Sequence, residues 1–473
     1  MKKTTLSILV SILVCLASGH PWKAQQFVII DTDGGLDDFR AINLILASPD
    51  IRVLAIVNSN GVLEAGTGYG KLCALMTDLG HEGILKGAYG KGRKGSVNCT
   101  GALEYEWGTK SENCSAVPDA GAMVQYILQH TEDQISFICL GSLDFAAACY
   151  EDIPDFRVRV GKIIWTGGGD ISGENFNYSL SPESYRLLVK QNNIPLISID
   201  AGLKNQYYSS ALLDELKEAG NQYTEKIMDC IENSAGIFSR KIFDEMAALY
   251  LHNPGLFMVE SRNGENCYSL SDTAEIPVLF EQILHGQADQ KNQVLKLIPG
   301  DTAAYQSDVA GIMEEAINKY GKEEWNAGVL ANELHRHLGV YATIGVKMGI
   351  RAREYFGAGI DEMYVLSHAG LTPPFSCMND GLQVSTGATL GHGLIEVSPD
   401  PTHLPRAEFT YLGQKIAVEL RNEYREKIEG KIKELATIHG LNSDIYWQLV
   451  REEALYFWFT WDRREIFRIE ILD

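Results

Sequence analysis

The sequence lacks a closely spaced pair of cysteines. Nine cysteines are scattered over 473 residues without a Cys-x-x-Cys pattern, which excludes a zinc ribbon and a thioredoxin-type redox motif. Positive charge is also scarce, because 41 Lys and Arg stand against 62 Asp and Glu and leave a formal charge of −21. An acidic chain repels phosphate backbones, so the composition argues against a nucleic-acid partner. A small neutral substrate or a bound cation remains compatible with it.

Long apolar runs are missing as well. The run at residues 6–17 follows Lys2 and Lys3, is too short for a comfortable membrane span, and leads into small residues. This pattern predicts a signal peptide over residues 1–24, with an uncleaved anchor as the alternative. We therefore expect a protein exported to the periplasm or the exterior of a bacterium, with no membrane span after processing. Export permits disulfides, and Cys99 and Cys114 lie in one polar loop where they could pair.

Short apolar runs alternate with longer amphipathic stretches from residue 25 onward. Strands are expected at 27–30, 53–57, 135–140, 162–165 and 195–199, and helices at 39–47, 122–129 and 182–190. This alternation predicts an α/β domain whose mostly parallel sheet is covered on both faces. Ligands of such sheets bind beyond the carboxyl ends of the strands, so the chemistry is expected there.

Composition shifts between residues 283 and 325, where polar and glycine-containing stretches interrupt the pattern. We place a domain boundary near 290–300, which gives an α/β domain over 25–290 and a second, α+β domain over 300–473. The stretch 416–438 is expected to be one long charged helix. No internal repeat or low-complexity tract is present, and the sequence is compatible with a homo-oligomer without specifying one.

The most informative segment contains four carboxylates in eight residues. Asp31, Asp33, Asp37 and Asp38 directly follow the first expected strand and precede a helix. Favourable acids at a helix N-terminus explain Asp37 and Asp38, but not Asp31 and Asp33 as well. A hard divalent cation bound by oxygen atoms would neutralise all four, so the segment predicts a metal site.

The segment Asp31-Thr-Asp-Gly-Gly-Leu-Asp-Asp38 resembles the N-terminal calcium motif of inosine/uridine-preferring nucleoside hydrolases. Further resemblances follow in order: Leu140-Gly-Ser-Leu-Asp-Phe-Ala146, Trp165-Thr-Gly-Gly-Gly169, Asn175-Phe-Asn177 and Phe243-Asp244. The resemblance covers residues 25 to 285. It implies a nucleoside-hydrolase-like fold and a glycosidase that acts on N-glycosyl bonds of a small nucleoside or sugar substrate.

The resemblance also implies roles for individual residues. Ca²⁺ would be held by Asp33, Asp38, Asp244 and the backbone carbonyl of Leu140, and Asp33 would act as general base toward a water. Asp37 and Asn177 would hold sugar hydroxyls. Asp31 would support the loop from behind the ligands.

Several positions depart from the family pattern. Phe243 stands where the family often has a His that protonates the leaving group, and Asn175, with Glu174 beside it, stands where a carboxylate usually grips the sugar. An Asn expected after the second strand aligns with Val62, although Asn58 and Asn60 are close. We therefore expect a calcium-dependent hydrolase that is divergent in sugar and base recognition. The alternative is a calcium-dependent sugar- or nucleoside-binding protein with little turnover.

The second domain carries His335-Arg-His337-Leu-Gly339 and, later, Cys377-Met-Asn-Asp380-Gly-Leu-Gln383. Together with residues 386–393, these motifs resemble the E-like domain of formylmethanofuran dehydrogenase. That family has a Cys where Gly339 stands, while Cys377 and Asp380 are retained. The resemblance implies a Zn²⁺ site through His337 and Cys377, and whether it persists without the lost thiolate is left open. A metal-handling protein that acts through this domain is a further alternative.

Overall fold

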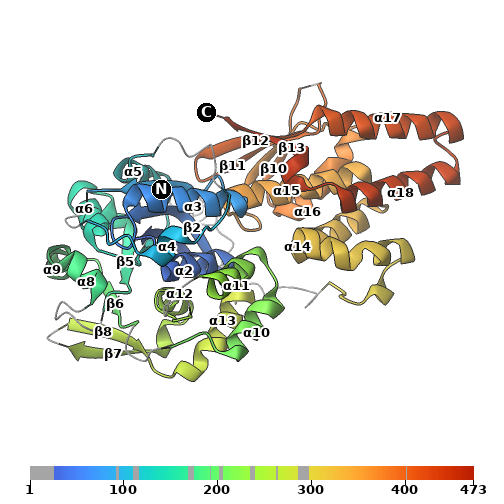
Figure 1. Ribbon diagram of the computed structural model, residues 1–473. Coiled ribbons are helices and arrows are strands. Elements are labelled where there is room, and N and C mark those ends of the chain that lie inside the picture. The colour runs from blue at the N-terminus through green and yellow to red at the C-terminus, as the bar shows by residue number, and fades with distance from the viewer. Residues whose placement is uncertain are drawn as a thin grey trace, which may run out of the picture.

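The computed structural model describes residues 26–91, 95–109, 117–168, 175–191, 193–201, 206–234, 240–262, 265–285, 298–400 and 402–472. The expected signal peptide and its cleavage point lie outside these residues, so export stays a prediction. Among the described helices, none is both long and apolar enough to cross a membrane. The first sheet carries a hydrophobic core on each face and the second sheet has its own, and Figure 1 shows the two parts side by side in an elongated molecule.

The first sheet has eight strands in the order β3-β2-β1-β4-β5-β6-β8-β7, and all neighbours are parallel except the edge strand β7. Its strands are β1 (Gln26–Thr32), β2 (Ile51–Ser59), β3 (Leu85–Tyr89), β4 (Ile135–Cys139), β5 (Val160–Trp165), β6 (Leu196–Ile199), β7 (Phe257–Arg262) and β8 (Glu265–Leu270). The five strands expected from the sequence are all confirmed. The predicted α/β class with a mostly parallel sheet is confirmed as well.

Helices cover both faces of this sheet because successive strand residues point to opposite sides. Val28 and Ile30 pack with one helical layer, and Ile29 between them packs with the other. The first layer comprises α2 (Leu36–Ala47), α3 (Ala65–Asp78), α4 (Thr100–Glu104), α10 (Ser210–Ala219), α11 (Gln222–Asn233), α12 (Glu245–His252) and α13 (Ile276–His285). The second comprises α5 (Ala120–His130), α6 (Asp144–Asp152), α7 (Phe156–Arg159), α8 (Phe176–Leu180) and α9 (Pro182–Gln191).

The second domain is α+β, as expected. Its five-stranded sheet has the order β10-β9-β11-β12-β13, with β9 (Tyr364–Ser367), β10 (Ile395–Val397), β11 (Arg406–Tyr411), β12 (Gln414–Leu420) and β13 (Phe467–Leu472). Its helices are α14 (Ser307–His335), α15 (Val340–Phe356), α16 (Met378–Thr386), α17 (Asn422–His439), α18 (Asp444–Thr460) and α19 (Arg463–Ile466).

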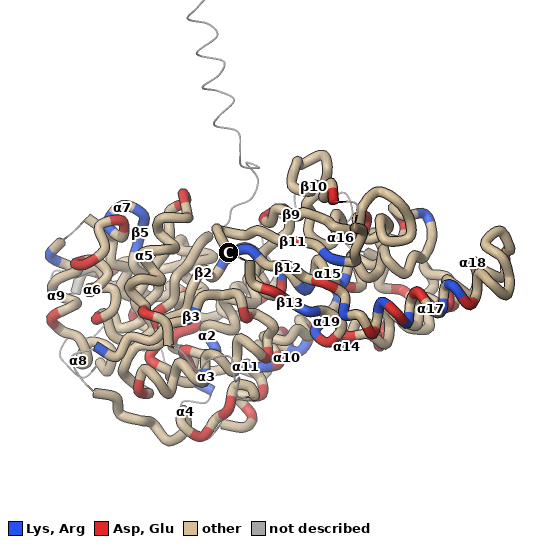
Figure 2. Tube along the Cα trace, turned by 90° about the horizontal axis from the view of Figure 1, so that it is seen from above, with Lys and Arg blue, Asp and Glu red and all other residues tan. Residues whose placement is uncertain are grey.

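The single long helix expected over residues 416–438 is wrong. Residues 416–420 belong to strand β12, which pairs on both sides with β11 and β13, and the helix α17 begins only at Asn422. The apolar residues Ile416, Val418 and Leu420 alternate and are buried, so tertiary pairing decides this segment. Along α17 basic and acidic side chains are interspersed, which suits a helix exposed to solvent (Figure 2).

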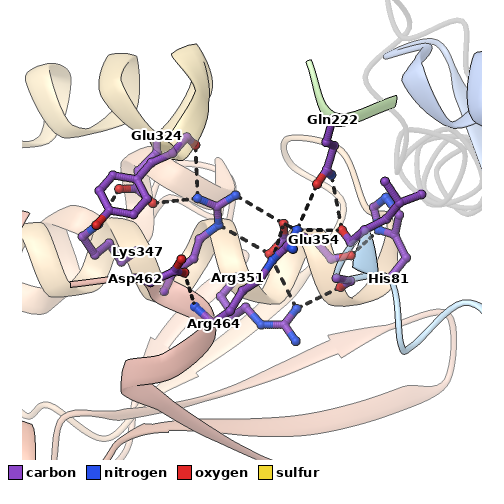
Figure 3. A network of polar contacts seen from close by, with 12 residues as sticks. His81, Gln222, Glu324, Lys347, Arg351, Glu354, Asp462 and Arg464 are labelled. Atoms are coloured by element: carbon purple, nitrogen blue, oxygen red, sulfur yellow. Dashed lines mark hydrogen bonds and ion pairs between the residues drawn. The ribbon is translucent and has the colours of Figure 1, made fainter. Parts of the chain in front are cut away.

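The two domains are joined by a polar network (Figure 3). Arg464 donates to the backbone carbonyls of Asp78 and Leu79 and to Oε1 of Gln222 at 2.7, 3.0 and 2.9 Å. His81 bonds through Nδ1 to the carbonyl of Glu354 and through Nε2 to the hydroxyl of Tyr223. Helix α11, which carries Gln222 and Tyr223, also packs against α2, so this network lies one helix away from the acidic segment.

Candidate metal centre and active site

The acidic segment turns from the end of β1 into helix α2. Gly34 has a φ of +89°, a conformation that side chains rarely adopt, and this turn brings the chain round into the helix. Asp38 lies in the first turn of α2, where its Oδ1 accepts hydrogen bonds from the Thr32 hydroxyl at 2.7 Å and from the Asp33 amide at 2.9 Å. The carboxylate of Asp38 is therefore held in a fixed position above the strand end.

Three carboxylates converge at this point. Asp37, Asp38 and Asp244 each place an oxygen within 4.8 Å of the others, and Asp38 and Asp244 are buried while Asp37 is partly exposed. Asp244 immediately precedes α12, so the N-termini of α2 and α12 both face the group. Helix dipoles favour negative charge at these ends, but they do not neutralise three carboxylates. The predicted ligands Asp38 and Asp244 are thus brought together. The third carboxylate of the set is Asp37, which was expected to bind sugar, and the predicted ligand Asp33 is not part of it.

Asp33 lies beside this group, and its buried side chain has no hydrogen-bond partner for either carboxylate oxygen among the described residues. Glycines make room for it, since a Cβ on Gly61 would come within 2.4 Å of Oδ2 and one on Gly141 within 2.6 Å of the Asp33 Cβ. A buried carboxylate without partners is costly unless a cation is close to it. The orphaned oxygens, all hard donors, therefore fit a divalent cation such as Ca²⁺.

Electrostatics support the same interpretation. Burial, and then the neighbouring carboxylates of Asp38 and Asp37, raises the pKa of Asp33 well above its ordinary value, and burial with Asp38 does the same for the pKa of Asp244. Burial and Asp38 also raise the pKa of Asp37 to about 7. Full ionisation of the cluster at neutral pH therefore requires added positive charge.

The Leu140 carbonyl is connected to the cluster through Thr166. It accepts from the Thr166 hydroxyl at 3.3 Å and from Nδ2 of Asn177 at 2.7 Å, and the same hydroxyl lies 2.5 Å from Oδ1 of Asp244. Thr166 was not assigned a role from the sequence, although it lies inside the glycine-rich segment that follows β5. Its hydroxyl contacts both the Leu140 carbonyl and the Asp244 carboxylate, the two groups that the sequence resemblance implies as ligands. Asn177, expected to bind sugar, lies at the same point.

The other expected substrate residues lie in different settings. Asn175 caps α8 by accepting from the amide of Tyr178 at 3.0 Å, and Glu174 lies outside the described residues. Asn60 accepts from the amide of Ala65 and donates to the carbonyl of Gly90, so both ends of its side chain bind backbone. Asn58, at the end of β2, is fully buried, and its Oδ1 has no partner in the part of the chain that the structure describes. Asn58 therefore has the free acceptor that Asn60 lacks.

Asp31 supports the cluster from one layer below. Its Oδ1 accepts from the Ser59 hydroxyl at 2.5 Å, and its backbone carbonyl accepts from the amide of Leu140. Burial raises the pKa of Asp31 well above its ordinary value, in spite of the hydrogen bond from Ser59. The supporting role expected for Asp31 stays a prediction.

In the second domain, His335 and Cys377 line a pocket of about 370 Å³. Nδ1 of His335 lies 2.7 Å from a carboxylate oxygen of Asp380, and its buried Nε2 has no partner within the described ranges. The ring of His337 lies 4.3 Å from that of His335. In the described part of the chain, the only set of three or more metal-ligating side chains within 4.8 Å of one another is Asp37, Asp38 and Asp244. The donors of the second domain are thus neighbours without forming a closed ligand set.

The possible pairing of Cys99 with Cys114 is wrong. Cys99 is an exposed free thiol, whereas Cys73, buried on α3, is disulfide-bonded. Cys114 itself lies outside the described residues. The closeness of Cys99 and Cys114 in one loop of the sequence therefore led to a wrong prediction that Cys99 forms a disulfide.

Comparison with known proteins bears on both domains. The profile of the family described as inosine-uridine preferring nucleoside hydrolase matches residues 28–320, and that of FmdE, molybdenum formylmethanofuran dehydrogenase operon, matches residues 334–467. The inosine-uridine preferring nucleoside hydrolase of Leishmania major is 24% identical over 260 residues, 49% of this chain and 81% of the relative. A pyrimidine-specific ribonucleoside hydrolase of Salmonella typhi is 22% identical over 257 residues, 50% of this chain and 82% of the relative.

Among solved structures, a purine-preferring ribonucleoside hydrolase from Gardnerella vaginalis matches with a TM-score of 0.44 and 14% identity, over 55% of this chain and 98% of that chain. The family assignment depends instead on the sequence profile, which spans more than half of the 473 residues. The chain therefore belongs to the inosine-uridine preferring nucleoside hydrolase family, glycosidases that act on N-glycosyl bonds, and carries an FmdE domain fused after the hydrolase domain.

Proposed function

We propose that the chain is a calcium-dependent hydrolase of a nucleoside-like N-glycoside. The observation that carries this proposal is Asp33, a buried carboxylate without partners beside three converging carboxylates. Asp33, Asp38, Asp244 and the Leu140 carbonyl would hold the ion. When bound, calcium supplies the positive charge that neutralises the cluster and makes an adjacent water more acidic.

Other steps, namely proton acceptance, sugar binding and positioning of the carbonyl, are assigned to residues of the chain. Asp33 accepts the proton of the attacking water, because it is the carboxylate of the cluster whose oxygens have no other partner. Asp37, partly exposed at the rim of the cluster, accepts hydrogen bonds from sugar hydroxyls. Thr166 and Asn177 fix the Leu140 carbonyl. The sugar is thereby held against the point where water is activated.

Turnover of a nucleoside panel tests this function. Release of base from inosine and uridine, and of p-nitrophenol from p-nitrophenyl riboside, should be measured in calcium and after chelation. We expect turnover that requires calcium and that is lost in Asp33→Asn, while the sugar still binds. Undiminished turnover after chelation would contradict calcium dependence. Calcium-dependent sugar binding without turnover of any substrate would favour the alternative of a binding protein.

A second function is a metal-handling role of the FmdE domain. The observation that favours it is His335, whose Nδ1 is oriented by Asp380 while its Nε2 is buried and unpartnered. Metal-binding histidines are commonly oriented by a carboxylate in this way. Cys377 would supply the thiolate and His337 a further nitrogen for Zn²⁺ after movement of the side chains.

Elemental analysis decides the second function. Zinc should copurify with the wild-type protein and with His439→Ala, and should be lost in the double variant His337→Ala/Cys377→Ala. Calcium in the first domain should be unchanged in the double variant, because the two sites use separate residues. A wild-type protein free of zinc after growth in zinc-rich medium would refute the zinc site.

A further inference from the structure

Lys241 is a cation whose backbone is bonded to Arg40 on α2, the helix that carries Asp37. It lies three residues before Asp244, in a segment that is paired backbone to backbone with the segment around Tyr207. Its Nζ lies 4.0 Å from the centroid of the Phe243 ring. The ammonium group therefore rests on the face of the residue that immediately precedes a metal-ligand candidate, and a cation in this position is attracted to the ring.

A buried ion pair fixes this segment to the helix that carries Asp37. Nε of Arg40, on α2, lies 2.8 Å from Oε1 of Glu245, and both side chains are fully buried. The same guanidinium donates through Nη2 to the carbonyl of Lys241 at 2.7 Å, and Glu245 accepts from the amide of Phe243 at 3.0 Å. The backbone on both sides of the Phe243 ring is thus tied to one helix. The backbone of Lys241 therefore cannot move relative to α2 without breaking charge-assisted hydrogen bonds.

Among the described residues, the ammonium of Lys241 has no counter-ion of its own, whereas the neighbouring cation Arg40 is already paired with Glu245. Burial lowers the pKa of Lys241, and the charge of Asp37 opposes this shift, so the two groups are close enough to influence each other. A donor of this kind beside a sugar-binding carboxylate is available to a substrate.

We propose that Lys241 is the residue that contacts the departing base and donates a proton to it. This inference builds on the proposed hydrolase function. The C1′–N bond breaks and its electron pair goes to the base, while a proton moves from the Nζ of Lys241 to a nitrogen or oxygen of the base. Water forms the new C1′–O bond and gives its proton to Asp33, and solvent later returns a proton to Lys241. Phe243 contributes the ring face that holds the ammonium in place.

Two substrates that differ in their leaving group test this role. Hypoxanthine leaves poorly unless it is protonated, whereas p-nitrophenolate leaves without help. For Lys241→Met we expect kcat/KM on inosine to fall by about 100-fold or more, the lower end of what a positioned acid contributes. On p-nitrophenyl riboside the same variant should keep its activity within about threefold, because that reaction needs no acid. Lys241→Arg, which keeps the charge but cannot give up a proton, should lose inosine hydrolysis much as Lys241→Met does.

Lys162→Met is the matched control, since Lys162 lies over the ring of Tyr250 near the start of β5, the end remote from the site. It should hydrolyse both substrates like the wild type. Equal losses on both substrates in Lys241→Met, or no loss on either, would overturn the proposal for Lys241. Failure of the wild type to hydrolyse p-nitrophenyl riboside would instead overturn the hydrolase function on which it depends.

Discussion

Removal of calcium should lower the stability of the hydrolase domain by a calculable amount. A ligand that binds only the folded state stabilises it by about 2.7 kcal/mol when its concentration is 100 times its Kd. For a domain of this size, about 1 kcal/mol corresponds to about 2–4 °C in Tm. We therefore expect chelation to lower the Tm by about 5–10 °C. Differential scanning calorimetry with calcium and with excess chelator measures this directly.

Asp38→Asn gives the sharpest variant, because the amide oxygen can still accept from the Thr32 hydroxyl and the Asp33 amide. Two carboxylates about 5 Å apart repel by about 3 kcal/mol at an effective dielectric constant of about 20. The variant should therefore be more stable than the wild type in chelator, since Asp38 and Asp244 no longer repel. In calcium the order should reverse, because a charged ligand is lost.

The calcium affinity of Asp38→Asn should fall by at least about 100-fold, equivalent to about 2.7 kcal/mol. Isothermal titration calorimetry measures this change. Asp214→Asn, an exposed position on α10, is the control and should bind calcium like the wild type. If Asp38→Asn showed the same calcium-induced rise in Tm as the wild type, the cluster would not be the calcium site.

Three further outcomes are expected. The wild type should cleave p-nitrophenyl riboside faster than inosine, because p-nitrophenolate leaves without protonation whereas hypoxanthine requires it; equal rates in a steady-state assay would contradict this. Arg464→Met should lower the free energy of unfolding in urea by about 2 kcal/mol, since it leaves the buried carboxylate of Glu354 with fewer donors. Burial lowers the pKa of His81 below its ordinary 6.5, so the unfolded chain binds more protons below pH 6.5 and stability falls as the pH falls. His81→Gln should reduce this loss in urea titrations at pH 7.5 and 5.5, and an unchanged slope would refute the assignment.

The α/β fold could be predicted because its information is local. Buried parallel strands appear as short apolar runs, and the acidic segment follows the first of them without interruption. The tail segment at 416–420 is a different case, since a short charged and apolar stretch is compatible with helix and strand alike. Only its pairing with β11 and β13 decides the outcome, and sequence periodicity does not contain that pairing.

The site could be predicted only in part for a related reason. Asp33, Asp37 and Asp38 belong to one segment and are recognised together, whereas Thr166 acquires its role from two partners far away in the sequence. Asn58 and Asn60 are chemically identical and two residues apart. They differ because Asn60 accepts a hydrogen bond from the backbone amide of Ala65 at the start of α3, whereas the Oδ1 of Asn58 is buried without a partner among the described residues. The surrounding fold decides this difference.

The contact between the domains also depends on residues far apart in the sequence and could not be predicted from it. This contact has a functional consequence. Glu354 binds arginines from α19, and although burial raises the pKa of this carboxyl, Arg463 and Arg464 lower it to about 2. The carboxylate of Glu354 therefore stays ionised and paired at physiological pH. Arg464, while paired with it, also donates a hydrogen bond to Gln222 on α11. Because α11 packs on α2, the FmdE domain buttresses the helix that presents Asp37 and Asp38. Loosening Arg464 is thus expected to affect calcium affinity as well as stability, although no residue of the FmdE domain is assigned to the cluster.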